Sequence, residues 1–110
     1  MELNFNKVQK HYLRLTLLNE KEPILIGTPT KKLLDKLVNM NSLVDTEDAN
    51  ELNPEQIGDI YNICAEVMSI NKTNRKISKA ELEEMFDIED LLLFFNTYME
   101  FLDSIVALKN

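Results

Sequence analysis

Cysteine, glycine and proline are scarce in this chain of 110 residues, and tryptophan is absent. A single cysteine, Cys64, cannot form a disulfide within the chain, which is typical of a protein in a reducing cytoplasm. Two glycines and three prolines are too few for a disordered or low-complexity chain. The sequence also lacks the basic start and apolar run of a signal peptide, and any apolar stretch near the ~20 residues of a membrane span. We therefore expect a cytoplasmic globular protein.

Positive charge is scarce as well. Lysine and arginine number 12 against 19 aspartates and glutamates, which gives a formal net charge of −7. Proteins that bind nucleic acid or anionic lipid gain much of their affinity from basic side chains that neutralise phosphates. We therefore expect neither nucleic acid nor a membrane as a partner. The same charge favours solubility and an encounter with a basic protein.

Residues that could carry catalysis stand alone. His11 is the only histidine, and no cysteine lies near it in the sequence to complete a catalytic pair or a metal site. Cys64 lies inside an apolar helical pattern, where core packing is the usual role of a free cysteine. The acidic stretch 45–51 fails as a calcium loop, because Asn50 and Gln56 replace the required Gly and Glu. We expect no enzyme activity, no cofactor and no metal.

The first recognisable pattern is that of a half-buried strand. Apolar and polar residues nearly alternate over residues 11–18, with Leu13, Leu15 and Leu17 on one side. A polar turn follows at 19–22, and residues 23–27 are typical of a second short strand. These features predict an antiparallel hairpin over about 11–27.

After the hairpin the apolar period changes from two residues to between three and four. Thr28 and Pro29 indicate a helix start, because threonine caps free N–H groups and proline suits the first helical position. Further start signals stand at Asn53, Ser78 and Asp87. We expect helices near 29–43, 54–70, 79–86 and 88–108. The predicted fold is therefore a single, mostly helical α+β domain spanning 1–110.

The apolar stripes of these helices predict which side chains form the core. Those that we expect to be largely buried are Ile60, Cys64, Val67, Leu92, Phe95 and Leu102.

The last predicted helix carries more apolar side chains than one buried stripe needs. Beside its main stripe, a second row of Phe94, Phe101 and Leu108 recurs at seven-residue spacing. Such a helix is either central in the fold or also faces a partner. We take the second row as a candidate partner-binding surface, used either for another protein or for self-association.

Several segments, taken in order, carry a resemblance to a known family. They are Leu3–Lys7 followed by the hairpin, the helix start 28–37, the polar loop 71–78, and 85–91 leading into an aromatic last helix. With this arrangement over most of its length, the chain resembles the tail assembly chaperones of long-tailed bacteriophages and prophages of Gram-positive bacteria.

The resemblance implies a non-enzymatic role in tail morphogenesis. Chaperones of this family bind the long helical tape measure protein, keep it soluble and help tail-tube subunits polymerise around it. The implied partners are the tape measure protein and the major tail protein, in the cytoplasm of the bacterial host and outside the mature virion. Many such phages also make a longer form by frameshifting, and this chain would be the short form. The charge alone leaves a second class open, a small acidic adaptor or inhibitor that binds a basic partner protein.

Overall fold

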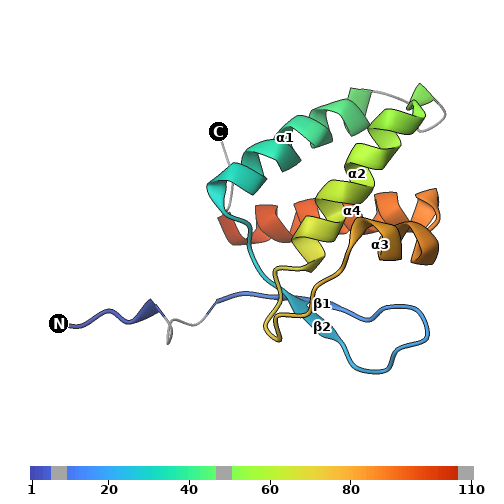
Figure 1. The fold of residues 1–110 in the computed structure, drawn as a ribbon. Coiled ribbons are helices and arrows are strands. Elements are labelled where there is room, and N and C mark those ends of the chain that lie inside the picture. The colour runs from blue at the N-terminus through green and yellow to red at the C-terminus, as the bar shows by residue number, and fades with distance from the viewer. Residues whose placement is uncertain (6–9, 47–50, 107–110) are drawn as a thin grey trace.

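In residues 1–5, 10–46 and 51–106, which the computed structural model describes, a β-hairpin precedes four helices (Figure 1). This confirms the predicted α+β class and the order of the elements. The strands are shorter than expected, and α4 is described as far as residue 106 of the expected 88–108. The elements are β1 (Leu13–Leu15), β2 (Ile24–Ile26), α1 (Lys31–Thr46), α2 (Pro54–Met68), α3 (Lys79–Met85) and α4 (Ile88–Val106).

The hairpin is antiparallel, and Leu13 lies opposite Ile26. Its alternation continues beyond the paired residues, because Leu17 is buried while Arg14 and Thr16 are exposed. The pairing of β1 with β2 ends at Leu15, before Leu17, because the chain enters the hairpin turn. The Leu17 carbonyl accepts a hydrogen bond from Glu20, and Asn19 has a φ of 63°, a left-handed conformation that asparagine tolerates better than most residues. The alternating pattern therefore marks the buried side correctly but overstates the strand length.

The loop after α2 covers the outer edge of β2. The Gly27 N–H donates to the Ile70 carbonyl at 2.8 Å, and the Lys72 N–H donates to the Leu25 carbonyl at 3.1 Å. An isolated bridge joins Ile26 to Asn71. In the described part of the chain, β1 pairs with β2 alone, so β1 is the edge strand.

The same loop is held together by the side chain of Asn71. Its amide nitrogen donates to the carbonyls of Met68 and Arg75 at 2.8 and 2.7 Å, and its amide oxygen accepts from the Arg75 N–H at 2.9 Å. The Arg75 guanidinium makes two hydrogen bonds of 2.8 Å to the Glu20 carboxylate. These hydrogen bonds lower the pKa of Glu20, and they join the loop to the hairpin turn.

Three helices begin at the positions that their start signals predict. In each, the capping side chain accepts a hydrogen bond from the backbone N–H three residues later, and the side chain there accepts one from the cap. This satisfies N–H groups that lack partners inside a helix. The pairs are Asn53 with Gln56, Ser78 with Glu81, and Asp87 with Asp90.

Helix α1 begins two residues later than the sequence predicts. The Thr30 carbonyl accepts the hydrogen bond of Leu34 at 2.8 Å, and the Thr30 hydroxyl lies 3.4 Å from the Leu33 nitrogen. Thr30 is therefore the cap, and the expected pairing of Thr28 with Pro29 is wrong. Both threonines have the chemistry of a cap. The backbone of Gly27 is still hydrogen-bonded to Ile70, and Thr28 follows Gly27 directly. The chain therefore turns into the helix only after Thr28.

The core lies between α2, α4 and the hairpin. Five of the six side chains expected to be buried are buried: Ile60, Cys64, Val67, Phe95 and Leu102. The sixth, Leu92, is only half-buried, and its neighbour Leu91 is fully buried instead. Successive residues of a helix lie about 100° apart, so burial of Leu91 places Leu92 at the margin of the buried face.

Two buried tyrosines make hydrogen bonds across the core. The Tyr61 hydroxyl donates to the Phe86 carbonyl at 2.6 Å, which ties α2 to the end of α3. The Tyr98 hydroxyl donates to the Gly27 carbonyl at 2.8 Å, which ties α4 to the end of β2. Each bond satisfies a donor and an acceptor that would be costly to bury alone.

Within the described residues, no helix combines the length and the apolar character needed to cross a bilayer.

We expect Tyr98→Phe to lower the free energy of unfolding by about 1–3 kcal/mol, because the buried Gly27 carbonyl loses its donor. Urea denaturation measures the change. Tyr12→Phe is the matched control, since the half-buried Tyr12 keeps its ring contact with Lys72 and should change stability by less than about 0.5 kcal/mol. Equal unfolding midpoints for the two variants would contradict the role given to the Tyr98 hydroxyl.

We expect Phe95→Ala to cost roughly 3–5 kcal/mol, because its ring is 1% exposed and its removal leaves a cavity. Leu93→Ala, on the exposed side of the same helix, should cost less than about 0.5 kcal/mol in the same urea titration. A loss under about 1 kcal/mol for Phe95→Ala would show that the ring is not enclosed.

Candidate functional site

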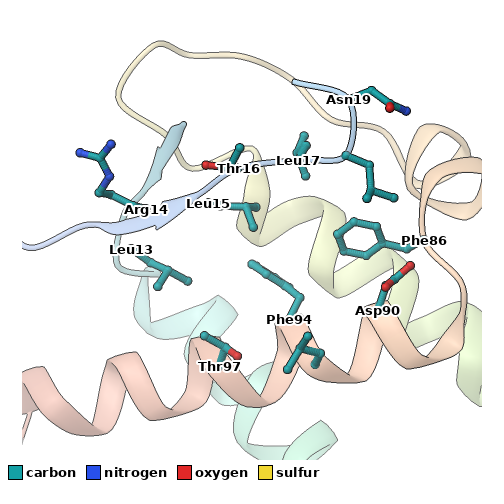
Figure 2. Close-up of a pocket in the computed structure, with 12 residues that line it drawn as sticks. Leu13, Arg14, Leu15, Thr16, Leu17, Asn19, Phe86, Asp90, Phe94 and Thr97 are labelled. Carbon is teal, nitrogen blue, oxygen red and sulfur yellow. The ribbon is translucent and has the colours of Figure 1, made fainter. Parts of the chain in front are cut away.

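A groove of about 490 Å³ lies between the hairpin and the last helix (Figure 2). One wall is β1 with the start of the hairpin turn, and the other is the α3–α4 corner with the first half of α4. Figure 2 shows Leu13, Leu15 and Leu17 on the strand side facing Phe94 on the helix side. The lining residues are Leu13, Arg14, Leu15, Thr16, Leu17, Leu18, Asn19, Phe86, Asp90, Leu93, Phe94 and Thr97.

The inner surface of this groove is apolar and firmly packed. Leu17, Phe86 and Phe94 are buried at 3%, 9% and 5% exposure, so each shows only a small part of its side chain to the groove. Leu13 and Leu15 are half-buried above them. These residues also belong to the core or pack against it, so the base of the groove is closely packed.

Exposed apolar side chains line the same groove. Leu18 is 60% exposed and Leu93 is 68% exposed, one on each wall. Most other large apolar side chains of the folded body are buried, so these two leucines are unusual. The large apolar side chains that the described residues expose are Met1, Leu3, Phe5, Leu18, Val38 and Leu93.

The groove carries one charged side chain of each sign. Arg14 comes from the exposed side of β1, and Asp90 comes from the first turn of α4. Figure 2 shows the two on opposite walls. The Asp90 carboxylate accepts the cap hydrogen bond of Asp87 at 3.2 Å, which fixes its place at the α3–α4 corner. The groove can therefore bind an apolar segment and orient it by charge.

Phe94 and Phe101, from the row predicted as a partner-binding surface, are less exposed than that role suggests. Phe94 is buried, and Phe101 is half-buried. Their rings pack on either side of Tyr98, with centroids 6.0 and 5.8 Å from it. Leu108 lies outside the described residues. Phe94 therefore packs in the core beneath the hairpin, and a role of this row in partner binding stays a prediction.

The two exposed leucines of the groove were missed by the sequence reasoning, although the sequence carries a signal for each. Leu18 breaks the alternation of β1 by following Leu17 directly, so it points away from the buried side. Leu93 is the third of three consecutive leucines, and no single face of a helix can hold all three. In the sequence, these two leucines stand out only as apolar residues beyond those that the buried faces need.

A second groove, of about 430 Å³, lies between α1 and α2 and is more polar. Lys36 and Glu66 face each other across it at 3.9 Å. Such an ion pair between exposed side chains contributes little stability, and it keeps charge at the opening. The remaining lining residues are Asn39, Met40, Leu43, Asp59, Asn62 and Ile63.

The residues considered for catalysis lie apart from both grooves. His11 is exposed, and Cys64 is 1% exposed within α2. Burial raises the pKa of the Cys64 thiol to about 12, so the reactive thiolate is scarce at neutral pH. Among residues 1–5, 10–46 and 51–106, no three acidic, histidine or cysteine side chains are grouped to hold a metal ion.

We expect a thiol reagent to label Cys64 in the native protein roughly 100-fold more slowly than in urea, because the thiol is both buried and protonated. Release of the chromophore from an aromatic disulfide reagent at pH 8 measures the rate. Complete labelling within the mixing time, without urea, would show that the thiol is accessible in the native fold.

Comparison with known proteins gives no relative from which a role could be transferred. No protein-family model matches the chain, and no match was found among curated proteins or solved structures.

Proposed function

We propose that this chain is a non-enzymatic protein that binds an apolar helical segment of a partner in the groove between β1 and α4. The observation that carries the proposal is the exposure of Leu18 and Leu93 on opposite walls of one groove with an apolar base. Exposed apolar patches on a folded domain commonly mark interaction surfaces. An apolar groove of this kind accepts the apolar face of an amphipathic helix.

The dimensions of the groove fit a short helical segment. The extended part of its strand wall runs from Leu13 to Leu17, about 13 Å at roughly 3.3 Å per residue, before the hairpin turn begins. A partner helix advances ~1.5 Å per residue, so about 9 of its residues would lie along this part of the wall. Apolar side chains at three- and four-residue spacing would then contact Leu18, Leu93 and the base of the groove.

Charge supports a partner with basic residues beside its apolar face. Asp90 lines the groove, and the exposed carboxylates of Asp87 and Glu89 lie close to it in the chain. Opposite charges around an apolar contact guide the encounter and set the orientation of the two proteins. The net charge of −7 also favours the solubility of a complex whose partner is poorly soluble alone.

These properties fit the role that the resemblance implies. We propose that the chain is a phage tail assembly chaperone and that its partner is the tape measure protein, a long helical protein. By coating this partner in the bacterial cytoplasm, the chaperone would keep the partner soluble and help major tail protein subunits to polymerise around it. The chaperone itself would be absent from the mature virion. Finding the gene between those for the major tail protein and a very long helical protein would support this role.

A second candidate function rests on a different surface. The side chains of five carboxylates on α3 and the start of α4 are exposed: Glu81, Glu83, Glu84, Asp87 and Glu89. A small acidic adaptor or inhibitor would use such a face to bind a basic protein. The affinity of such a complex would fall steeply with added salt, whereas apolar contacts in the groove would not weaken in this way.

We expect the double variant Leu18→Ser, Leu93→Ser to lose the ability to keep the tape measure protein soluble during co-expression. Each leucine contributes on the order of 1.5–3 kcal/mol when buried, so affinity should fall at least about 100-fold. Both side chains are exposed, so the variant should remain folded, which circular dichroism and a thermal melt verify.

Val38→Ser is the matched control for this experiment. Val38 is 52% exposed on α1, away from the groove, and its loss should leave the soluble fraction of the partner unchanged. If the folded double variant keeps the partner as soluble as the wild type does, the groove is not the binding surface. A complex that dissociates on addition of salt would then favour the acidic face.

A further inference from the structure

The place of Leu18 on the groove wall depends on the hairpin turn. Leu18 is 60% exposed, so packing of its own side chain does little to fix it. It lies in a four-residue turn, in which the Glu20 N–H donates to the Leu17 carbonyl at 3.1 Å and Asn19 has a φ of 63°. Figure 2 shows Leu17 and Asn19 at the end of the strand wall nearest Phe86. Buried Leu17 anchors the start of the turn, so the position of Leu18 depends on what holds the other end, at Glu20.

Arg75, 55 positions further along the chain, holds that other end. Its guanidinium donates two hydrogen bonds of 2.8 Å, one to each oxygen of the Glu20 carboxylate. Two parallel hydrogen bonds fix the orientation of the carboxylate as well as its distance, which a single contact does not. The two side chains are 37% and 33% exposed, whereas the ion pair between Lys36 and Glu66 is longer, at 3.9 Å, and more exposed. The pair of Arg75 with Glu20 is therefore suited to keep the turn in one geometry.

The backbone that carries Arg75 is itself held from two sides. The Asn71 side chain accepts a hydrogen bond from the Arg75 N–H at 2.9 Å and donates one to the Arg75 carbonyl at 2.7 Å. The same amide nitrogen donates to the Met68 carbonyl at the end of α2, and the Lys72 N–H donates to Leu25 in β2. The loop is thus tied to α2 and to β2. Arg75 can therefore fix the position of the turn instead of moving with it.

We propose that Arg75 is a positioning residue for the groove: by holding Glu20, it fixes Leu18 on the wall opposite Leu93. Neither Arg75 nor Glu20 is among the residues that line the groove, so the pair acts through the turn. A wall that is ordered before the partner arrives loses less conformational freedom on binding, which strengthens the complex. This role of Arg75 rests on the proposed function, because it is a role in binding at that groove.

Hydrogen exchange of the chain alone tests whether Arg75 orders the turn. In Arg75→Gln, the Glu20 amide, which is bonded to Leu17, should exchange at least about tenfold faster than in the wild type. The Phe86 amide at the end of α3 should keep its rate, which shows that the rest of the fold is unchanged. Lys36→Gln is the matched control, since it removes an exposed ion pair elsewhere and should leave the Glu20 amide as it is. An unchanged rate for Glu20 in Arg75→Gln would overturn the proposal.

Binding of the partner tests the effect on the groove. The probe is a fluorescein-labelled helical fragment of the tape measure protein that co-purifies with the wild type, and fluorescence anisotropy measures its affinity. Arg75→Gln should bind the fragment about three- to tenfold more weakly, because the partner must then order the turn. Arg75→Lys keeps the charge but not the two parallel hydrogen bonds, so its affinity should be intermediate. Lys36→Gln should bind like the wild type. Equal affinities of Arg75→Gln and the wild type would contradict the positioning role.

A charge exchange separates positioning from direct contact with the partner. Glu20→Arg and Arg75→Glu should each weaken binding, because like charges then face each other. Both changes in one chain should restore most of the affinity, since the pair forms again in the reverse direction. A double variant that binds no better than Arg75→Glu would show that Arg75 contacts the partner itself, and the proposal would fail. Circular dichroism and the urea midpoint verify that each variant is folded.

Failure of this role and failure of the proposed function give different results. If Leu18→Ser, Leu93→Ser abolishes binding of the fragment while Arg75→Gln binds normally, the groove is the binding surface but Arg75 does not position it. If Leu18→Ser, Leu93→Ser binds the fragment as well as the wild type does, the groove is not the binding surface. The role of Arg75 in binding then fails with the proposed function, whatever the exchange rate of the Glu20 amide.

Discussion

The hydrogen bond from Tyr98 to the Gly27 carbonyl is the constraint on which the site depends. It joins residues 71 positions apart and is buried, so both groups would lack a partner if the hairpin moved away from α4. Burial raises the pKa of the Tyr98 hydroxyl, so it remains a donor throughout the pH range of life. The Gly27 N–H is held from the other direction by Ile70. The end of β2 is thereby fixed between α4 and the loop after α2, and β1 is held over the helix at a distance that leaves a groove.

This constraint explains why α4 is apolar on two sides. One side packs in the helical core through Leu91, Phe95 and Leu102, while Phe94 and Phe101 flank Tyr98 beneath the hairpin. A helix covered by helices on one side and by a hairpin on the other needs two apolar faces. The short hairpin covers only part of the second face. The groove is the remaining part, with Leu93 at its edge.

Local signals in the sequence predict the elements well because those signals act over a few residues. The capping pairs at Asn53, Ser78 and Asp87 and the alternation around Leu15 were enough for the order, type and approximate limits of the elements. The errors arise from tertiary contacts. A choice between Thr28 and Thr30 as cap depends on where Gly27 is bonded, and the burial of Phe94 depends on which face of α4 the hairpin covers. The groove was not predictable for the same reason, since its walls come from opposite ends of the chain and meet only through the Tyr98 bond.

A groove beside an edge strand is both useful and hazardous for a small acidic protein. Unpaired strand edges with apolar residues nearby promote uncontrolled association, and natural proteins limit it with short strands and charge. Here β1 has three paired residues, Arg14 faces outward, and the net charge of −7 makes copies repel one another. That repulsion opposes contacts between copies, whereas it favours the approach of a basic partner. The net negative charge that favours the solubility of a protein with exposed leucines therefore also favours a basic partner, rather than a second copy, as the protein that covers them.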